Sequence, residues 1–139
     1  EWNLRFVTAA QGMLGYELDI CRLSDETRCI LREQIRKYQY FRHVIENGKY
    51  AVISAPQCGD TSIYYYFTEK EILLSILWKG KGKFPRIFIP DANENVVYKE
   101  VFSGKIVNGK ELKNGGFYKI PNERTAEIHY YIQIDSFGD

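Results

Sequence analysis

Residues 15–50 read GYELDICRLSDETRCILREQIRKYQYFRHVIENGKY, and this stretch decides the fold class. Residues 16–20 alternate in polarity, which predicts a short strand. Ser24 predicts the start of a helix, because its hydroxyl can accept a hydrogen bond from a backbone N–H of the first turn. Asp25 and Glu26 follow, where the positive end of a helix dipole favours carboxylates. A strand followed by a capped helix is therefore expected.

The helix is expected to run for about 22 residues, which is roughly 33 Å at 1.5 Å per residue. Its apolar residues recur at spacings of 4, 3, 3 and 4, which predicts one continuous apolar stripe. The stripe residues are Leu31, Ile35, Tyr38, Phe41 and Ile45. Asn47 and Gly48 are expected to end the helix, with a residue in the left-handed conformation.

After Gly48 the sequence changes to the pattern of strands. Up to eight strands are expected, over residues 50–54, 62–68, 72–78, 86–89, 96–101, 105–107, 117–120 and 126–134. Turns are expected between them, among them residues 56–60 and a hairpin turn at Asn108-Gly109, where both residues tolerate positive φ. Short strands with such turns are typical of an antiparallel sandwich. The predicted fold class is α+β, with a helical segment over residues 1–48 and an antiparallel β-sandwich domain over residues 49–139.

The first residues, EWNLRFVTAAQGM, also predict a helix, over residues 2–13. Leu4, Val7 and Ala10 are spaced three apart, which suits one face of a helix. The chain begins inside this amphipathic pattern and without an initiator methionine. We therefore expect the sequence to be a cut made within a longer protein.

The composition is that of an ordinary folded domain: 139 residues, of which 45% are hydrophobic and 27% charged. The formal charge of +1 gives no electrostatic reason to expect a nucleic acid or an acidic membrane as partner. Cys21, Cys29 and Cys58 are odd in number and form no C-x-x-C motif, so neither a disulfide framework nor a zinc site is expected. The sequence shows no signal peptide and no apolar run long enough to span a membrane. We expect a reducing, cytoplasmic location and no cofactor or metal.

Glu17 and Asp19 are the first candidates for chemistry, because on the predicted strand they would face the same side. Paired carboxylates act in glycoside hydrolysis when they flank the sugar about 5 Å or more apart. Neighbours on one strand seldom straddle a substrate in this way. A role in a turn or as solvated charges is the favoured interpretation.

Tyr64, Tyr65 and Tyr66 could stack on sugar rings, as in carbohydrate-binding modules. On a strand their rings alternate between the two faces, which favours cross-strand packing. His43 lies on the polar side of the predicted helix and His129 on the polar side of its predicted strand, which favours solvated or hydrogen-bonded histidines. Cys29 has no predicted histidine partner. The residues therefore form no set of nucleophile, base and orienting group, and no catalytic residue is predicted.

The sequence around the predicted strand and helix resembles the end of the catalytic barrel in family 36 glycoside hydrolases, the bacterial α-galactosidases. The matching residues are Arg5, the string GMLGYELD at 12–19, Leu23, Ser24, Glu26, Glu33, Gln34, Ile35, Tyr38, Gly48 and Tyr50. Ala55-Pro56 and the string NGKELKNGG at 108–116 are similar to weaker family features. One departure is Ala51-Val52, near which the family often has an arginine.

The resemblance implies that residues 1–48 are the last pieces of a (β/α)₈ barrel and that residues 49–139 are the C-terminal β-domain. Family members retain configuration and use an Asp nucleophile and an Asp acid/base on earlier barrel strands. Neither is carried over to this chain, and Asp19 is the nearest candidate for the active-site face. The implied parent hydrolyses terminal α-galactosides of raffinose-type oligosaccharides and is a homo-oligomer, whereas the 139-residue chain is expected to be structural and inactive.

Two other interpretations stay open at this point. The chain could be a freestanding carbohydrate-binding or protein-interaction module that uses outward rings among Tyr64, Tyr65 and Tyr66. The parent could instead be an α-N-acetylgalactosaminidase or a galactosyl transferase of related architecture. Without the barrel, the apolar stripe of the long helix needs another partner, and we expect self-association through the helices or a helix folded back on the sandwich.

Overall fold

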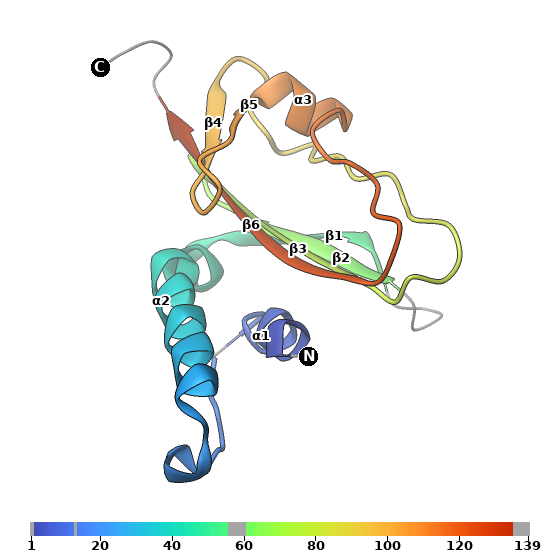
Figure 1. The fold of residues 1–139 in the computed structure, drawn as a ribbon. Helices are drawn as coiled ribbons and strands as arrows, with labels where there is room; N and C mark the ends of the chain where they lie inside the picture. The colour runs from blue at the N-terminus through green and yellow to red at the C-terminus, as the bar shows by residue number, and fades with distance from the viewer. Residues whose placement is uncertain (1, 13, 56–60, 135–139) are drawn as a thin grey trace.

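The computed structural model describes residues 2–12, 14–55 and 61–134. Along the chain, helices come first, and strands make up most of the rest (Figure 1). They are α1 (Trp2–Ala9), the 3₁₀ helix η1 (Ile20–Arg22), α2 (Asp25–Asn47), β1 (Lys49–Ser54), β2 (Thr61–Phe67), β3 (Glu71–Trp78), β4 (Val97–Glu100), β5 (Ile106–Asn108), α3 (Gly109–Asn114) and β6 (Thr125–Ile134). The α+β class is confirmed. The expected turn at 56–60 lies outside the described residues.

One antiparallel sheet of six strands forms the centre, in the order β1-β2-β3-β6-β4-β5. The last strand, β6, lies between β3 and β4. One face of the sheet carries α1 and the C-terminal half of α2, and the other is covered by α3 and the irregular segments on either side of β4 and β5 (Figure 1). Both faces are therefore buried over β3 and β6, and each has its own apolar core.

Two of the expected strands, residues 86–89 and 117–120, are not strands. The layer opposite the helices is consequently built from irregular chain and α3. Residues 86–89 do alternate, since Ile87 and Ile89 are buried and Arg86 and Phe88 are exposed. Their backbone, however, bonds to α3, with Ile89 N–H donating to the Leu112 carbonyl at 2.9 Å. The alternating sequence thus indicated which side chains face the core, but it did not show that the backbone pairs with a strand.

The strand expected over residues 16–20 is also absent: these residues run irregularly into η1. A lone extended segment has no partner for its backbone groups, and a strand needs one. No neighbouring strand pairs with this segment within the described parts of the chain.

Helix α2 begins as expected, with Thr27 N–H donating to Ser24 Oγ at 3.1 Å. Its predicted stripe is only partly right, because Ile35 is 42% exposed and Ile45 is half-buried. The buried residues of α2 are Leu31, Gln34, Tyr38, Phe41 and Val44. Gln34 can be buried because its amide donates to the Trp2 carbonyl at 3.1 Å and accepts from the Tyr16 hydroxyl at 2.6 Å.

The Asn-Gly pairs at 47–48 and 108–109 act differently from the expectation. Gly48 has φ −82°, so α2 does not end in the left-handed conformation. Glycine is needed there for space, since a Cβ would lie 2.3 Å from the Val44 carbonyl oxygen and 2.9 Å from that of Phe67. Asn108-Gly109 is no hairpin turn, because Asn108 Oδ1 accepts from Lys110 N–H at 2.9 Å and caps α3.

Packing of the helical segment on the sheet is centred on Phe41 and Val44 of α2, which contact the helix-facing side of β3 and β6. The C-terminal half of α2 folds back on the β-domain, which is one of the two outcomes expected for the apolar stripe. Self-association through the helices stays a prediction. The division between residues 48 and 49 stays a prediction. Across residues 2–12, 14–55 and 61–134, no helix is both long and apolar enough to span a membrane.

Candidate functional site

Asp19, the predicted candidate for an active-site face, holds a turn. Its Oδ1 accepts from Cys21 N–H at 3.2 Å and so caps η1, and its Oδ2 lies 3.1 Å from Arg22 Nε. The side chain is 57% exposed. Glu17 is exposed and shares no strand with Asp19. The turn role favoured from the sequence is thus the one that the structure places on Asp19.

The tyrosine candidates lie mainly in packed surroundings. Tyr64 and Tyr65 are 4% and 2% exposed, and burial raises the pKa of both hydroxyls. The Tyr65 hydroxyl donates to Asp91 Oδ2 at 2.5 Å. Tyr66 donates to the Gln11 carbonyl at 3.1 Å, and its ring lies 5.2 Å from that of Tyr50. The rings are engaged in the cross-strand packing favoured from the sequence, and this disfavours stacking of Tyr64 or Tyr65 on a sugar.

A first polar cluster, the Glu71 cluster, joins α2 to the sheet. Glu71 Oε1 lies 2.7 Å from His43 Nε2 and accepts from the Tyr130 hydroxyl at 2.5 Å. Glu71 Oε2 accepts from Thr68 Oγ1 at 3.1 Å. Burial by itself raises the pKa of the Glu71 carboxyl, but the hydrogen bonds from Tyr130, His43 and Thr68 outweigh it and leave the pKa lowered. The cluster therefore holds a carboxylate between helix and sheet.

Glu71→Gln is expected to lower the free energy of unfolding by about 1–3 kcal/mol at neutral pH, because it removes the charged acceptor of three donors. The folded-state pKa of Glu71 lies below its ordinary value of 4.5, so this stabilisation is complete above that pH. It is lost as the pH falls through the folded-state pKa. Urea unfolding at pH 7 and pH 3 checks this. A gap between wild type and variant that stays constant with pH would contradict it, and Glu94→Gln, at an exposed position, is the control.

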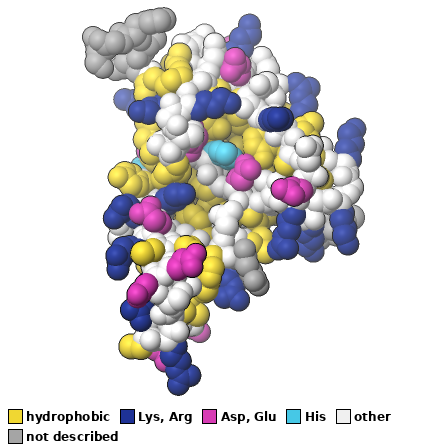
Figure 2. Space-filling model, viewed as in Figure 1, with side chains coloured by type: hydrophobic (Ala, Val, Ile, Leu, Met, Phe, Trp, Pro, Cys, Tyr) yellow, Lys and Arg dark blue, Asp and Glu magenta, His cyan; other side chains and the backbone are white. Residues whose placement is uncertain are grey.

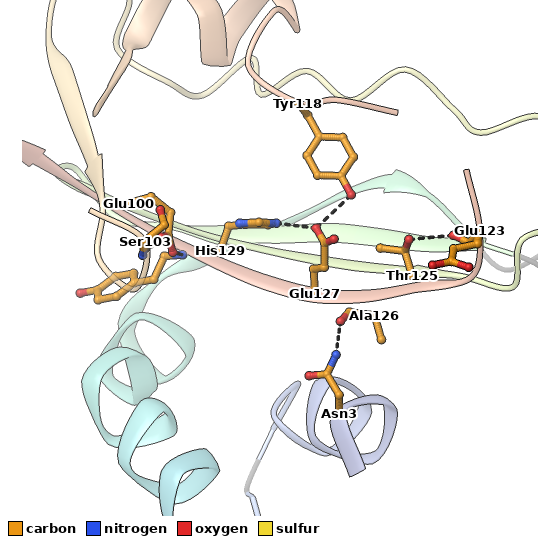
Figure 3. Close-up of polar contacts among 10 residues, drawn as sticks. Asn3, Glu100, Ser103, Tyr118, Glu123, Thr125, Ala126, Glu127 and His129 are labelled. Carbon is orange, nitrogen blue, oxygen red and sulfur yellow. Dashed lines mark hydrogen bonds and ion pairs between the residues drawn. The ribbon is translucent and has the colours of Figure 1, made fainter. Parts of the chain in front are cut away.

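A second cluster, the Glu127 cluster, lies on the opposite face of the sheet (Figure 3). Glu127 Oε2 lies 2.7 Å from His129 Nε2 and accepts from the Tyr118 hydroxyl at 2.9 Å. The hydrogen bond from His129 is the main cause that lowers the pKa of Glu127, against burial, which raises it. On the same side of β6, Tyr131 is buried under Phe117. Segment 117–118 thus covers this face of the strand.

The two clusters have similar compositions. Each contains one carboxylate, one histidine and a tyrosine, with no serine, cysteine or second carboxylate in hydrogen-bond contact. In the parts of the chain that the structure describes, no group of three or more His, Cys, Asp and Glu residues could hold a metal ion. Sequence reasoning missed both glutamates. The one available signal was the spacing of Glu127 and His129, two apart on a strand.

An apolar groove of about 590 Å³, here called the α2 groove, lies open at the surface. It lies between the segment before α2 and the part of α2 that projects away from the sheet (Figure 1). Its apolar lining includes Leu14, Leu18, Ile20, Leu23, Leu31, Ile35 and Tyr38. Figure 2 shows hydrophobic side chains exposed among charged ones on this projecting part of the molecule. Ile20 is 67% exposed, so apolar surface is left open here.

Comparisons with known proteins place this architecture among bacterial α-galactosidases. No family model matches the chain. It is 22% identical to Alpha-galactosidase 1 of Pediococcus pentosaceus, with 95% of this chain and 19% of that protein covered. It is 30% identical to the bifunctional alpha-galactosidase/sucrose kinase AgaSK of Mediterraneibacter gnavus, with 94% of this chain and 14% of that protein covered. The chain thus spans less than a fifth of the length of the curated relatives it matches.

Solved structures share the fold. The GH36 α-galactosidase AgaB from Geobacillus stearothermophilus matches with a TM-score of 0.82 and 18% identity, over 96% of this chain and 19% of that one. A variant of AgaA from the same organism, solved in complex with stachyose, matches with a TM-score of 0.78 and 19% identity, over 94% of this chain and 19% of that one.

Proposed function

We propose that this chain, which resembles a C-terminal portion of GH36 α-galactosidases, is the joint between the catalytic barrel and the C-terminal β-domain of such a glycosidase. The parent would hydrolyse terminal α-galactosides by double displacement, with its two carboxylates on barrel strands outside these residues. The 139 residues would have a structural role and no turnover of their own. A cytoplasmic location and a homo-oligomeric parent belong to the same proposal. The exposed thiols of Cys21 and Cys29 suit a reducing compartment.

The observation that carries the proposal is the α2 groove. The N-terminal half of α2 keeps Ile30 and Ile35 37% and 42% exposed, whereas the other half of the helix packs on the sheet. A helix with one half packed and apolar side chains open on the other half needs a second layer. The preceding strands and helices of a barrel would supply that layer, and Leu18 and Leu23 lie in the segment that would join it.

A chimera tests the proposal. This chain would replace the matching 19% of Geobacillus AgaB, and turnover of an aryl α-galactoside would be measured. We expect the chimera to hydrolyse the substrate and the free 139-residue chain to give no turnover above buffer. A folded but inactive chimera, or turnover by the free chain at the rate of an ordinary enzyme, would contradict the proposal.

Ile35→Asp sharpens the test. In the free chain it is expected to lower stability by about 1 kcal/mol, because Ile35 is 42% exposed there. In the chimera it would bury an unpaired charge between α2 and the barrel and cost several kcal/mol. Arg36→Asp is the matched control, since Arg36 is the next residue, is 61% exposed and does not line the groove. Equal thermal shifts in free chain and chimera would mean that the groove is not a docking surface.

A further inference from the structure

The strand β6 has one open edge. Over residues 131–134 it pairs with β4, and over residues 125–132 it pairs with β3 on its other side. In an antiparallel strand the N–H and C=O of one residue point to the same side, and successive residues alternate. The Tyr130 N–H donates to Glu100 Oε1 and its C=O accepts from Val101 N–H, both on the β4 side. The backbone groups of Ile128 and Ala126 must therefore point the same way, beyond the end of β4.

Part of this edge is held by a side chain instead of a strand. Asn3 Nδ2 of α1 donates to the Ala126 carbonyl at 2.5 Å from the helix side of the sheet (Figure 3). Asn3 is exposed, so its amide can move aside. Among the described residues, no strand covers the Ile128 N–H and C=O. About five residues of edge are open, a length of roughly 17 Å.

The surroundings of the edge make a short groove. Two hollows both have Asn3, Ala126 and Glu127 in their linings. One, of about 200 Å³, lies on the helix side, and the other, of about 690 Å³, runs along residues 121–125. The helix-side hollow has apolar walls from Phe6, Val7 and Phe102. The Lys37 ammonium lies at this hollow, 5.4 Å from the centre of the Phe102 ring. The Lys37 ammonium therefore places a positive charge beside the apolar hollow.

We propose that this edge, which we call the β6 edge (residues 125–129), binds a short extended peptide segment as an added strand. Backbone bonds to Ala126 and Ile128 would hold the segment, in place of the Asn3 amide. Its residues i and i+2 face the same side. An aliphatic side chain at position i fills the hollow between Phe6 and Phe102, and a carboxylate at i+2 pairs with Lys37.

A second copy of this chain fits the edge less well. Two β6 edges paired antiparallel around a two-fold axis would place the helix faces of both copies on the same side of the joint sheet. Both Lys37 side chains would then lie along one seam, where like charges repel. An acidic segment from another polypeptide would instead place its carboxylate beside the positive charge of Lys37.

The test uses the ¹⁵N-labelled 139-residue chain and the peptide acetyl-Thr-Val-Thr-Glu-Thr-amide. We expect saturable shifts of the Ala126 and Ile128 amide signals and slower hydrogen exchange at Ile128. Replacing the peptide's Glu by Lys is expected to weaken binding about tenfold, and Lys37→Glu is expected to reverse that preference. Lys110→Glu, at an exposed position on α3, is the control and should leave both affinities unchanged.

A second pair of changes tests the backbone bonds. Ile128→Pro removes the outward N–H and leaves the ladder to β3 intact, so it is expected to abolish binding while far-UV circular dichroism stays native. Methylating the backbone nitrogen of the peptide's Val, which would face β6 in an antiparallel added strand, does the same from the ligand side and needs no change to the protein. No saturation at millimolar peptide, or binding indifferent to Lys37→Glu and to the N-methyl group, overturns the proposal. So does concentration-dependent self-association that Ile128→Pro removes, because the occupant is then a second copy.

Discussion

Phe41→Ala is expected to lower the free energy of unfolding by about 3–5 kcal/mol, as for other large truncations in a packed core. Phe41 is 0% exposed, and its ring lies 6.5 Å from that of Phe6 in α1 and 5.7 Å from that of Tyr38 in α2. It also lies 6.3 Å from the rings of both Phe102 and Tyr130. The Phe41 side chain thus joins α1 and α2 to the sheet. Its removal leaves a cavity that the surrounding packed side chains cannot fill.

Urea unfolding followed by circular dichroism measures the effect. Ile35→Ala is the matched control, because it lies on the same helix and is 42% exposed. The control is expected to cost about 1 kcal/mol or less. Equal losses for the two variants would mean that the helix–sheet core does not carry the stability of the chain.

Gly109→Ala is expected to cost about 3 kcal/mol or more, the range of severe overpacking. A Cβ at this position would lie 1.9 Å from the Asn93 carbonyl oxygen and 2.8 Å from that of Val96. Both are backbone atoms of the turn that leads into β4, and Gly109 N–H donates to the same Val96 carbonyl at 2.8 Å. No side chain can rotate away, so the turn or the start of α3 must shift.

Gly116→Ala is the control for the Gly109 substitution, because nothing lies within 4 Å of its added Cβ. Thermal unfolding should separate the two variants by many degrees, since about 1 kcal/mol moves the midpoint by roughly 3–8 °C in chains near this size. Similar midpoints would refute the close approach of α3 to residues 93–96.

The elements that local chemistry specifies were predictable. The Ser24 cap, the length of α2 and strands β1, β2, β3 and β6 follow from hydroxyl caps, glycine and side-chain period, which act within a few residues. The same reasoning placed Tyr64 and Tyr65 in packing and Asp19 in a turn. It erred at residues 86–89, where burial alternates in a covering segment that pairs with no strand of the sheet. It also erred at residues 117–120, where Phe117 is buried, Lys119 and Ile120 are exposed, and no strand forms.

The polar clusters could largely not be predicted from the sequence. His43 and Glu71 are 28 residues apart, and Tyr130 is 59 beyond Glu71, so nothing local connects them. Their meeting depends on β6 entering the sheet beside β3. The open edge of β6 likewise exists because β4 ends at Glu100, whose carboxylate takes the Tyr130 N–H in place of a strand.

By itself, the sequence determined the α+β class, the capped helix of residues 24–47 and the resemblance to the end of a glycosidase barrel, because each depends on residues close together in the chain. Tertiary structure alone decided that Ile35 is exposed while Gln34 is buried, that Gly48 and Gly109 are needed for space, and that β6 has a free edge. These outcomes depend on which surfaces come into contact. The packing of segments far apart in the chain decides this, and the hydrophobic period of a single segment does not.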